Sequence, residues 1–344
     1  LQEFYWWQNG KSGLEKIRHN GAAAWLQALT LWLDIYIGPY ALWSYLAGYL
    51  LCLTLIPAFW VVCDRRISPA VFWFLIAVCL LIWVGDYNRP QVLDYHWRIV
   101  EVGCQIATLA GGMLAMHAIL KHNHVLLGAS LFGAFIASHT HGGYAYFHIL
   151  LVFLALQDTR PKARLGWIGA ILVYAIYMYA IEGTYADLVA RLLSGDDGSS
   201  SLVDVVLAAI FLYSVIVVNL LEQIFGFANS PWLRLLFYVP LAGLSAVAIY
   251  RFLLKKDPVA GSFLLFQATG FAFVLLAAIA RFERYGFSLV DIPRYSSYST
   301  LALIAMLWYG ASLARPLIST VVLAGFAVLL FPTIQFTKQE IDSV

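Results

Sequence analysis

Charged residues are scarce in this sequence, since Asp, Glu, Lys and Arg together make up 12% of its 344 residues. Soluble proteins carry about 25% of such residues. The formal net charge is only +2 and no basic run is present, so we expect no nucleic acid partner. The deficit excludes an ordinary soluble domain and favours a chain that lies in a bilayer.

Cysteines and short catalytic motifs are also few. The 4 cysteines lie in or beside apolar runs and form no CxxC pair, so we expect small buried side chains and no disulfide framework. GxSxG, P-loop, HExxH, GxGxxG and haem signatures are absent, and no signal peptide is visible. Because the sequence begins with Leu1, we expect further N-terminal residues before it, with room for another span.

Apolar and aromatic residues are abundant, at 62% and 16% of the chain. A run of about 20 apolar residues crosses the roughly 30 Å of hydrocarbon in a bilayer, and such spans are helical because lipid leaves no other partner for backbone groups. The runs predict spans at 39–63, 68–85, 98–120, 165–183, 202–225, 232–254, 258–281, 298–314 and 316–333.

Residues 124–156 are less simple. Two shorter apolar runs, 124–138 and 143–156, are separated by "SHTHGG", which predicts either two short helices or a re-entrant pair. With these, the sequence predicts an all-α, polytopic bundle of about 9–11 membrane helices. We expect a polar or interfacial segment over 1–37 and a single transmembrane domain over 38–344.

Lys and Arg set the expected orientation, because cytoplasmic loops are enriched in them. Residues 64–66, 121–124 and 160–164 are expected in the cytoplasm, which puts 86–98 and 184–201 outside.

If every predicted span crosses the membrane, residues 251–257 would lie outside. The Lys255–Lys256 pair contradicts that side, because basic residues favour the cytoplasm. We therefore expect that 202–225 is not a full span and that 281–297 joins 86–98 on the outer side.

The first candidate site is "GDYNRPQVLDYHWRIVE" at 85–101. Charges at the membrane edge are costly to remove from water unless they are paired. Asp94 or Asp86 would act as a general base on a sugar hydroxyl, while His96 and Arg98 would hold a phosphate. The alternative is a solvated loop with an aromatic belt.

The second candidate site is "ARFERYGFSLVDIPRYSSYS" at 280–299. Arginine suits bidentate phosphate recognition, which favours Arg281 and Arg294 as anion ligands, with Tyr295 against a sugar or at the headgroups. The alternative is a positive flank that sets topology, followed by ordinary helix-capping serines.

Two further patterns are weaker. His139, His141 and His148 are arranged for a metal or for lining a cavity at a helix break, although a turn is the plainer interpretation. Asp34 lies in the apolar stretch "LTLWLDIYIGPY". An acid in such a run is a functional candidate, which favours Asp34 as a substrate-binding residue, and the alternative is an interfacial helix with one polar side.

The stretch "ARFERYGFSLVDIPRYSSYSTLALIAMLWYG" resembles a block found in multi-pass bacterial membrane proteins with surface-polysaccharide functions. That group is similar to GT-C glycosyltransferases and Wzy-type polymerases, which use polyprenyl-linked sugars at the outer face of the inner membrane. The resemblance implies that Arg294 and Tyr295 lie near the lipid phosphate. It also implies that Arg281 corresponds to an arginine that the family has earlier in the same block.

The resemblance extends to residues 18–34, where His19, Asn20 and Asp34 fit an early block of that group. The sequence departs from it at Gly21–Ala23, which stand where the group has a Glu-His-Arg cluster. A catalytic acid would then come from Glu3, Glu15, Asp86 or Asp94, or the chain would be a non-catalytic subunit.

These patterns together favour transfer or polymerisation of sugars from a polyprenyl phosphate-linked donor to a glycan or protein acceptor. No cofactor is required, and a divalent Mg or Mn ion at the diphosphate is compatible with this chemistry. The alternatives are a transporter or flippase of a lipid-linked or anionic substrate, against which the sequence shows no inverted repeat, and the subunit of a larger membrane complex.

Overall fold

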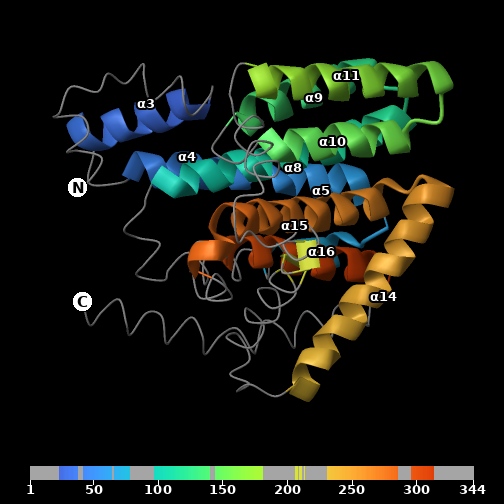
Figure 1. Ribbon diagram of the computed structural model, residues 1–344. Helices are drawn as coiled ribbons and strands as arrows, with labels where there is room; N and C mark the ends of the chain where they lie inside the picture. The colour runs from blue at the N-terminus through green and yellow to red at the C-terminus, as the bar shows by residue number, and fades with distance from the viewer. Residues whose placement is uncertain are drawn as a thin grey trace. The chain divides into compact units, whose positions relative to one another are not determined.

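The computed structural model describes residues 23–37, 42–63, 66–77, 97–139, 144–180, 206–207, 209–210, 213, 231–285 and 296–313 (Figure 1). Nearly all of these residues are helical, and none of them lies in a strand. The predicted all-α class is therefore confirmed for the part of the chain that the structure describes.

The chain divides into two compact units, each described here by itself. Unit 1 comprises Leu1–Phe59 and Tyr95–Ala186, and unit 2 comprises Trp60–Asp94 and Asp187–Val344. The boundary falls within α5 (Leu55–Cys63). The single transmembrane domain expected over 38–344 stays a prediction.

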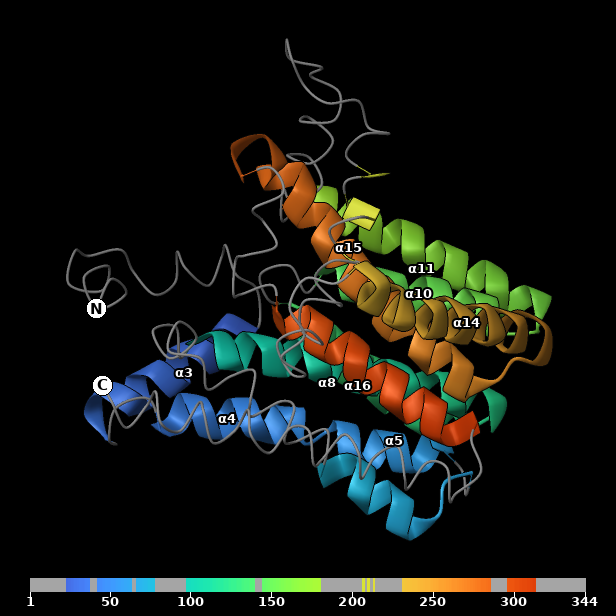
Figure 2. The ribbon, with the colours of Figure 1, turned by 90° about the horizontal axis from the view of Figure 1, so that it is seen from below.

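Helix α8 (Trp97–Leu120) is the centre of unit 1. It packs against α3 (Ala23–Tyr36), α4 (Leu42–Cys52), α9 (His124–Ser138) and α10 (Tyr144–Gln157), and Figure 2 shows α3, α4 and α8 side by side. Among the described helices of this unit, α11 (Pro161–Ala180) packs on α10.

Glycines allow two of these helices to approach α8 closely. A Cβ on Gly103 would lie 2.7 Å from the backbone oxygen of Gly48 on α4. A Cβ on Gly111 would lie 2.9 Å from both the Ser130 oxygen and the Ala134 Cβ on α9. Small residues at such contacts are how membrane helices gain close packing.

The turn between α8 and α9 is fixed by two local motifs. His122 adopts a left-handed conformation with φ of 52°, and the Asn123 N–H donates to the Ala118 oxygen at 2.9 Å, which closes the end of α8. The Asn123 side chain then accepts from the Leu126 N–H at 3.0 Å and caps α9. The chain therefore reverses direction, and α9 runs back along α8.

Helices α9 and α10 are short, with 15 and 14 residues. At 1.5 Å per residue each covers only about 21–22 Å, less than the roughly 30 Å of a hydrocarbon core. The prediction of two short helices in this region is confirmed, and whether they re-enter the membrane stays a prediction.

The described part of unit 2 contains three long helices: α14 (Pro231–Lys255), α15 (Pro258–Tyr285) and α16 (Ser296–Leu313). Helix α15 packs against the other two. Its Phe263 ring stacks on Tyr309 of α16 at a centroid distance of 4.8 Å. The Trp308 Nε1–H donates to the Cys63 sulfur at 3.0 Å, which joins α16 to the end of α5.

Among the described residues, three helical stretches are long and apolar enough to cross a bilayer: Leu42–Cys63, which joins α4 and α5, Val100–Leu120 and Pro258–Leu276. They match the predicted spans 39–63, 98–120 and 258–281, and they identify the chain as a membrane protein by length and composition. Helices α11, α14 and α16 occupy the positions of three further predicted spans. The span predicted at 316–333, most of the span at 202–225 and residues 78–85 of the span at 68–85 lie outside the described residues.

Helix α3 has its polar side inward and its apolar side outward. Thr30 and Asp34 are 4% and 8% exposed, whereas Leu29, Trp32 and Tyr36 are 53%, 43% and 64% exposed. In water the arrangement would be reversed, because apolar surface is driven inward. The helix is thus suited to contact with lipid.

Candidate functional site

The structure describes only part of the predicted site. Asp86, Asp94, His96, Arg294 and Tyr295 lie outside the described residues. Their proposed roles therefore stay predictions.

Arg98 lies in the first turn of α8 and Arg281 near the end of α15, and for both only the helix backbone is described. Of the residues assigned to catalysis or substrate binding, Asp34 alone has a described side chain.

The Asp34 carboxylate ties the end of α3 to the start of α4. Its Oδ1 accepts from the Trp43 N–H at 2.6 Å, and its Oδ2 accepts from the Ser44 N–H at 3.2 Å and the Ser44 hydroxyl at 2.6 Å. The first N–H groups of a helix have no partner within the helix and carry its positive dipole end, so a buried carboxylate is stabilised there. These contacts give Asp34 a structural role, and its substrate-binding role stays a prediction.

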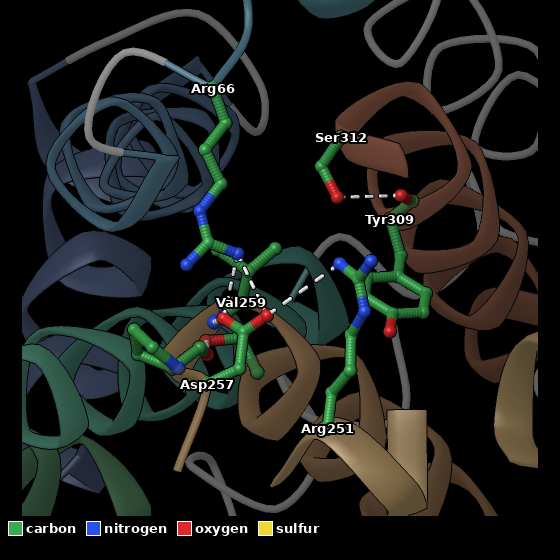
Figure 3. Close-up of polar contacts among 8 residues, drawn as sticks. Arg66, Arg251, Asp257, Val259, Tyr309 and Ser312 are labelled. Atoms are coloured by element: carbon green, nitrogen blue, oxygen red, sulfur yellow. Dashed lines mark hydrogen bonds and ion pairs between the residues drawn. The ribbon is translucent and has the colours of Figure 1, made fainter. Parts of the chain in front are cut away.

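A cluster of charges lies where α14 turns into α15, as Figure 3 shows. Asp257, 8% exposed, caps α15: its Oδ1 accepts from the Val259 N–H at 3.0 Å, directly after Pro258 at the first helical position. The preceding Lys256 has a φ of 51°, which allows the sharp reversal. This turn places the Asp257 carboxylate against Arg66.

Two arginines from different parts of the chain flank that carboxylate. Arg66 Nη1 donates to both Asp257 oxygens at 2.8 Å, and Arg251 Nη1 lies 3.9 Å from Oδ2. The Arg66 and Arg251 side chains are 39% and 36% exposed. Tyr309 lies beside Arg251 (Figure 3), is fully buried, and has no hydrogen-bond partner for its hydroxyl among the described residues. We call Arg66, Arg251, Asp257 and Tyr309 the turn cluster.

The turn cluster lies at the ends of its helices. It joins the residues after α5, the end of α14, the start of α15 and the last turns of α16. Arg66 and the Lys255–Lys256 turn therefore share one end of unit 2, which supports the expectation that both belong to one side of the membrane.

Arg281 lies toward the opposite end of α15, a helix of 28 residues that is about 42 Å long. Helix α16 packs against α15 and begins at Ser296, so its chain direction returns it to the turn cluster at Tyr309. The Arg281 turn and the start of α16 therefore lie at the end away from Asp257.

A polar seam on α8 was not singled out by the sequence patterns. Glu101, Gln105 and Thr108 are 7%, 0% and 1% exposed. Their i, i+4, i+7 spacing, which puts them on one face of a helix, is the signal that would have found them. An ionisable residue inside a membrane helix is a functional candidate.

The histidines of "SHTHGGYAYFH" do not converge on a metal in the described residues. His139 Nδ1 bonds to the Phe135 oxygen at 2.6 Å, and His148 Nε2 bonds to the Ile171 oxygen at 3.2 Å. His141 lies outside the described residues, among which no group of three His, Cys, Asp or Glu side chains is arranged to hold a metal. His139 instead packs against the rings of Phe135 and Tyr144.

A second carboxylate organises the connection between α10 and α11. Asp158 is 1% exposed and accepts from Arg160 Nε at 2.9 Å, from Arg160 Nη2 at 2.8 Å and from Trp167 Nε1 at 3.2 Å. The Arg160 hydrogen bonds hold the pKa of the Asp158 carboxyl at about 2. All of these contacts fix the start of α11, so we assign Asp158 a structural role.

Comparison with known proteins gives no match: no family model, no curated protein and no solved structure matches the chain.

Proposed function

We propose that this protein transfers or polymerises sugars from a polyprenyl phosphate-linked donor at the outer face of the bacterial inner membrane. The observation that carries the proposal is the arrangement of α15 and α16. It brings the Arg281 turn and the start of α16 to the end of unit 2 opposite the turn cluster.

The sidedness of this arrangement supports the proposal. The end that holds Arg66, Arg251 and the Lys255–Lys256 turn is basic, and the positive-inside rule assigns such an end to the cytoplasm. The Arg281 end then faces the outer leaflet. A helix N-terminus favours negative charge, so the start of α16 suits a lipid-borne phosphate.

The chemistry assigned to the predicted residues is a glycosyl transfer. Asp94 or Asp86 removes the proton of the acceptor hydroxyl as its oxygen bonds to the anomeric carbon. The bond from that carbon to the phosphate oxygen breaks, and the phosphate leaves with the electron pair. Arg294 and Arg281 stabilise the charge on the leaving phosphate, with His96 and Arg98 as further ligands.

Binding and turnover test the proposal separately. Purified protein should bind polyprenyl phosphate, and Arg281→Ala and Arg294→Ala should each weaken binding at least tenfold, the loss of about one charge-assisted hydrogen bond. Lys162→Ala is the matched control, because Lys162 is exposed in the first turn of α11. Asp94→Asn should keep binding and lose transfer. Wild type that does not bind, or arginine variants that bind equally well, would refute the site.

A transporter or flippase is the second candidate, favoured by the short helices α9 and α10. Each ends before it has crossed a full hydrocarbon core, as the discontinuous helices of transporters do. If the Asp94→Asn variant still moves a polyprenyl-linked sugar across the membrane of proteoliposomes, transport would be favoured over glycosyl transfer.

A further inference from the structure

We infer that the turn cluster binds the phosphate headgroup of an anionic membrane lipid, at the end of unit 2 opposite the proposed glycosyl-transfer site. The ligand is a phosphate diester on a diacyl lipid, held by Arg66, Arg251 and the Tyr309 hydroxyl. This site is independent of the proposed function, because it uses none of the residues assigned to sugar transfer.

The charge balance of the cluster favours an anion. Among the described residues of the cluster, two guanidinium groups flank one carboxylate, which leaves one positive charge over, and Lys255 and Lys256 lie in the same turn. Each lysine or arginine near an anionic membrane surface adds to the attraction of anionic lipids.

The arginines also keep donors for a ligand. Among the described residues Arg66 bonds to Asp257 through Nη1 alone, so its Nε and Nη2 stay available. Arg251 lies 3.9 Å from the carboxylate, beyond hydrogen-bond distance. Both side chains are more than a third exposed, so a headgroup can reach them.

The Tyr309 hydroxyl also indicates that a ligand binds at the turn cluster. It is fully buried on α16 and lacks a hydrogen-bond partner in the described part of the chain. A buried hydroxyl without a partner is unfavourable, so an acceptor atom placed there would stabilise it. Figure 3 shows the Tyr309 ring beside the Arg251 side chain, so a phosphate oxygen at Arg251 would lie on the same side of the cluster.

The surface beside the cluster suits acyl chains better than a soluble phosphate. Val247, Tyr250 and Leu254 are 42%, 54% and 72% exposed on α14. Together with Arg251 they follow the i, i+3, i+4, i+7 spacing of one helix face. A lipid whose headgroup bonds to Arg251 can therefore lay its chain along the same face, a contact that free phosphate cannot make.

Native mass spectrometry of the detergent-solubilised full chain tests this inference. We expect phosphatidylglycerol to bind at least tenfold more tightly than phosphatidylcholine, and inorganic phosphate to bind far more weakly than phosphatidylglycerol. Arg251→Gln and Tyr309→Phe should each weaken phosphatidylglycerol binding about tenfold, the equivalent of one hydrogen bond to a charged group. Tyr179→Phe is the matched control, because Tyr179 is 56% exposed on α11 and belongs to no part of the turn cluster, and it should bind as wild type does.

Both test variants spare the Arg66–Asp257 hydrogen bonds, so they are expected to fold, and an unchanged helical circular dichroism spectrum checks this. Arg251→Lys should fall between wild type and Arg251→Gln, because it keeps the charge and loses the planar fork. Equal binding of the two lipids, or either test variant binding as wild type does, would overturn the inference. Inorganic phosphate binding as tightly as phosphatidylglycerol would overturn the assignment to a lipid.

Discussion

A single nitrogen of Arg66, Nη1, donates hydrogen bonds of 2.8 Å to both carboxylate oxygens of Asp257, 191 residues further along the chain. The same carboxylate caps α15 through the Val259 N–H. The Asp257 side chain thus connects the residues after α5 to the turn between α14 and α15. Both its charge and its capping oxygen contribute to the stability of unit 2.

Replacing Asp257 with Asn separates these two contributions. Asn caps a helix about as well as Asp, so the change removes the ion pair and keeps the cap. Because Arg66 is 39% exposed and screened by solvent, we expect a loss of only about 1 kcal/mol. Asp257→Ala should cost about 1 kcal/mol more through the lost cap. Thermal unfolding in detergent measures both, and a double-mutant cycle with Arg66→Gln isolates the pair. Equal stability of the Asn and Ala variants would contradict the capping role.

Asp34 should behave as a structural residue. Asp34→Ala leaves the Ser44 hydroxyl and the first N–H groups of α4 without their acceptor, which should cost about 2–3 kcal/mol and lower Tm. Ser44→Ala removes one of the three hydrogen bonds and should cost about 1 kcal/mol. A Tm for Asp34→Ala equal to that of wild type would show that the α3–α4 tie contributes nothing.

The contact at Gly111 should not accept a methyl group. Its added Cβ would meet the Ser130 oxygen and the Ala134 Cβ at 2.9 Å, so Gly111→Ala must push α9 away from α8 and should cost about 1–3 kcal/mol. Gly133 on α9 has open space around it, and Gly133→Ala should raise stability by about 0.5–1 kcal/mol through helix propensity. Thermal unfolding of the two variants compares them directly, and the same sign for both would contradict the close packing.

Asp158 should make the protein sensitive to acid. Its pKa is held at about 2, below the value of about 3.9 in an unfolded chain, by the Arg160 hydrogen bonds. A lowered folded pKa gives stability that is complete above the unfolded value and is lost as pH falls from about 4 to about 2. The difference in Tm between wild type and Asp158→Asn should therefore shrink over this window. A Tm difference between wild type and Asp158→Asn that stays constant from about pH 6 to about pH 2 would contradict the stabilising role of the ionised Asp158 carboxylate.

The helices were the predictable part of this fold. Apolar runs predicted spans at 39–63, 98–120 and 258–281, because the length of a membrane helix is set by the bilayer itself. The break near "SHTHGG" was visible for the same reason. The direction in which α3 turns its polar side could not be predicted, because Asp34 points inward only through its hydrogen bonds with α4.

The turn cluster could not be predicted, because nothing in the sequence links Arg66 to Asp257. The text "KKDP" at 255–258 does signal a helix end followed by a capped helix start, and Arg66 was visible as a topology marker. Their pairing depends on how α5, α14 and α15 pack. The buried hydroxyl of Tyr309 depends on the same packing, since an apolar helix gives no sign of which aromatic residue faces a charge.

The shortness of α9 and α10 has a consequence for the surrounding lipid. Both helices cover about 21–22 Å, and α9 exposes Val125 and Phe132 at 84% and 67%. A bilayer of about 30 Å can meet such a surface by thinning locally, at fractions of a kcal/mol for each ångström of mismatch. We expect the two leaflets to come closest beside α9, which shortens the path of any polar headgroup that crosses there and favours residence of the protein in thinner membranes.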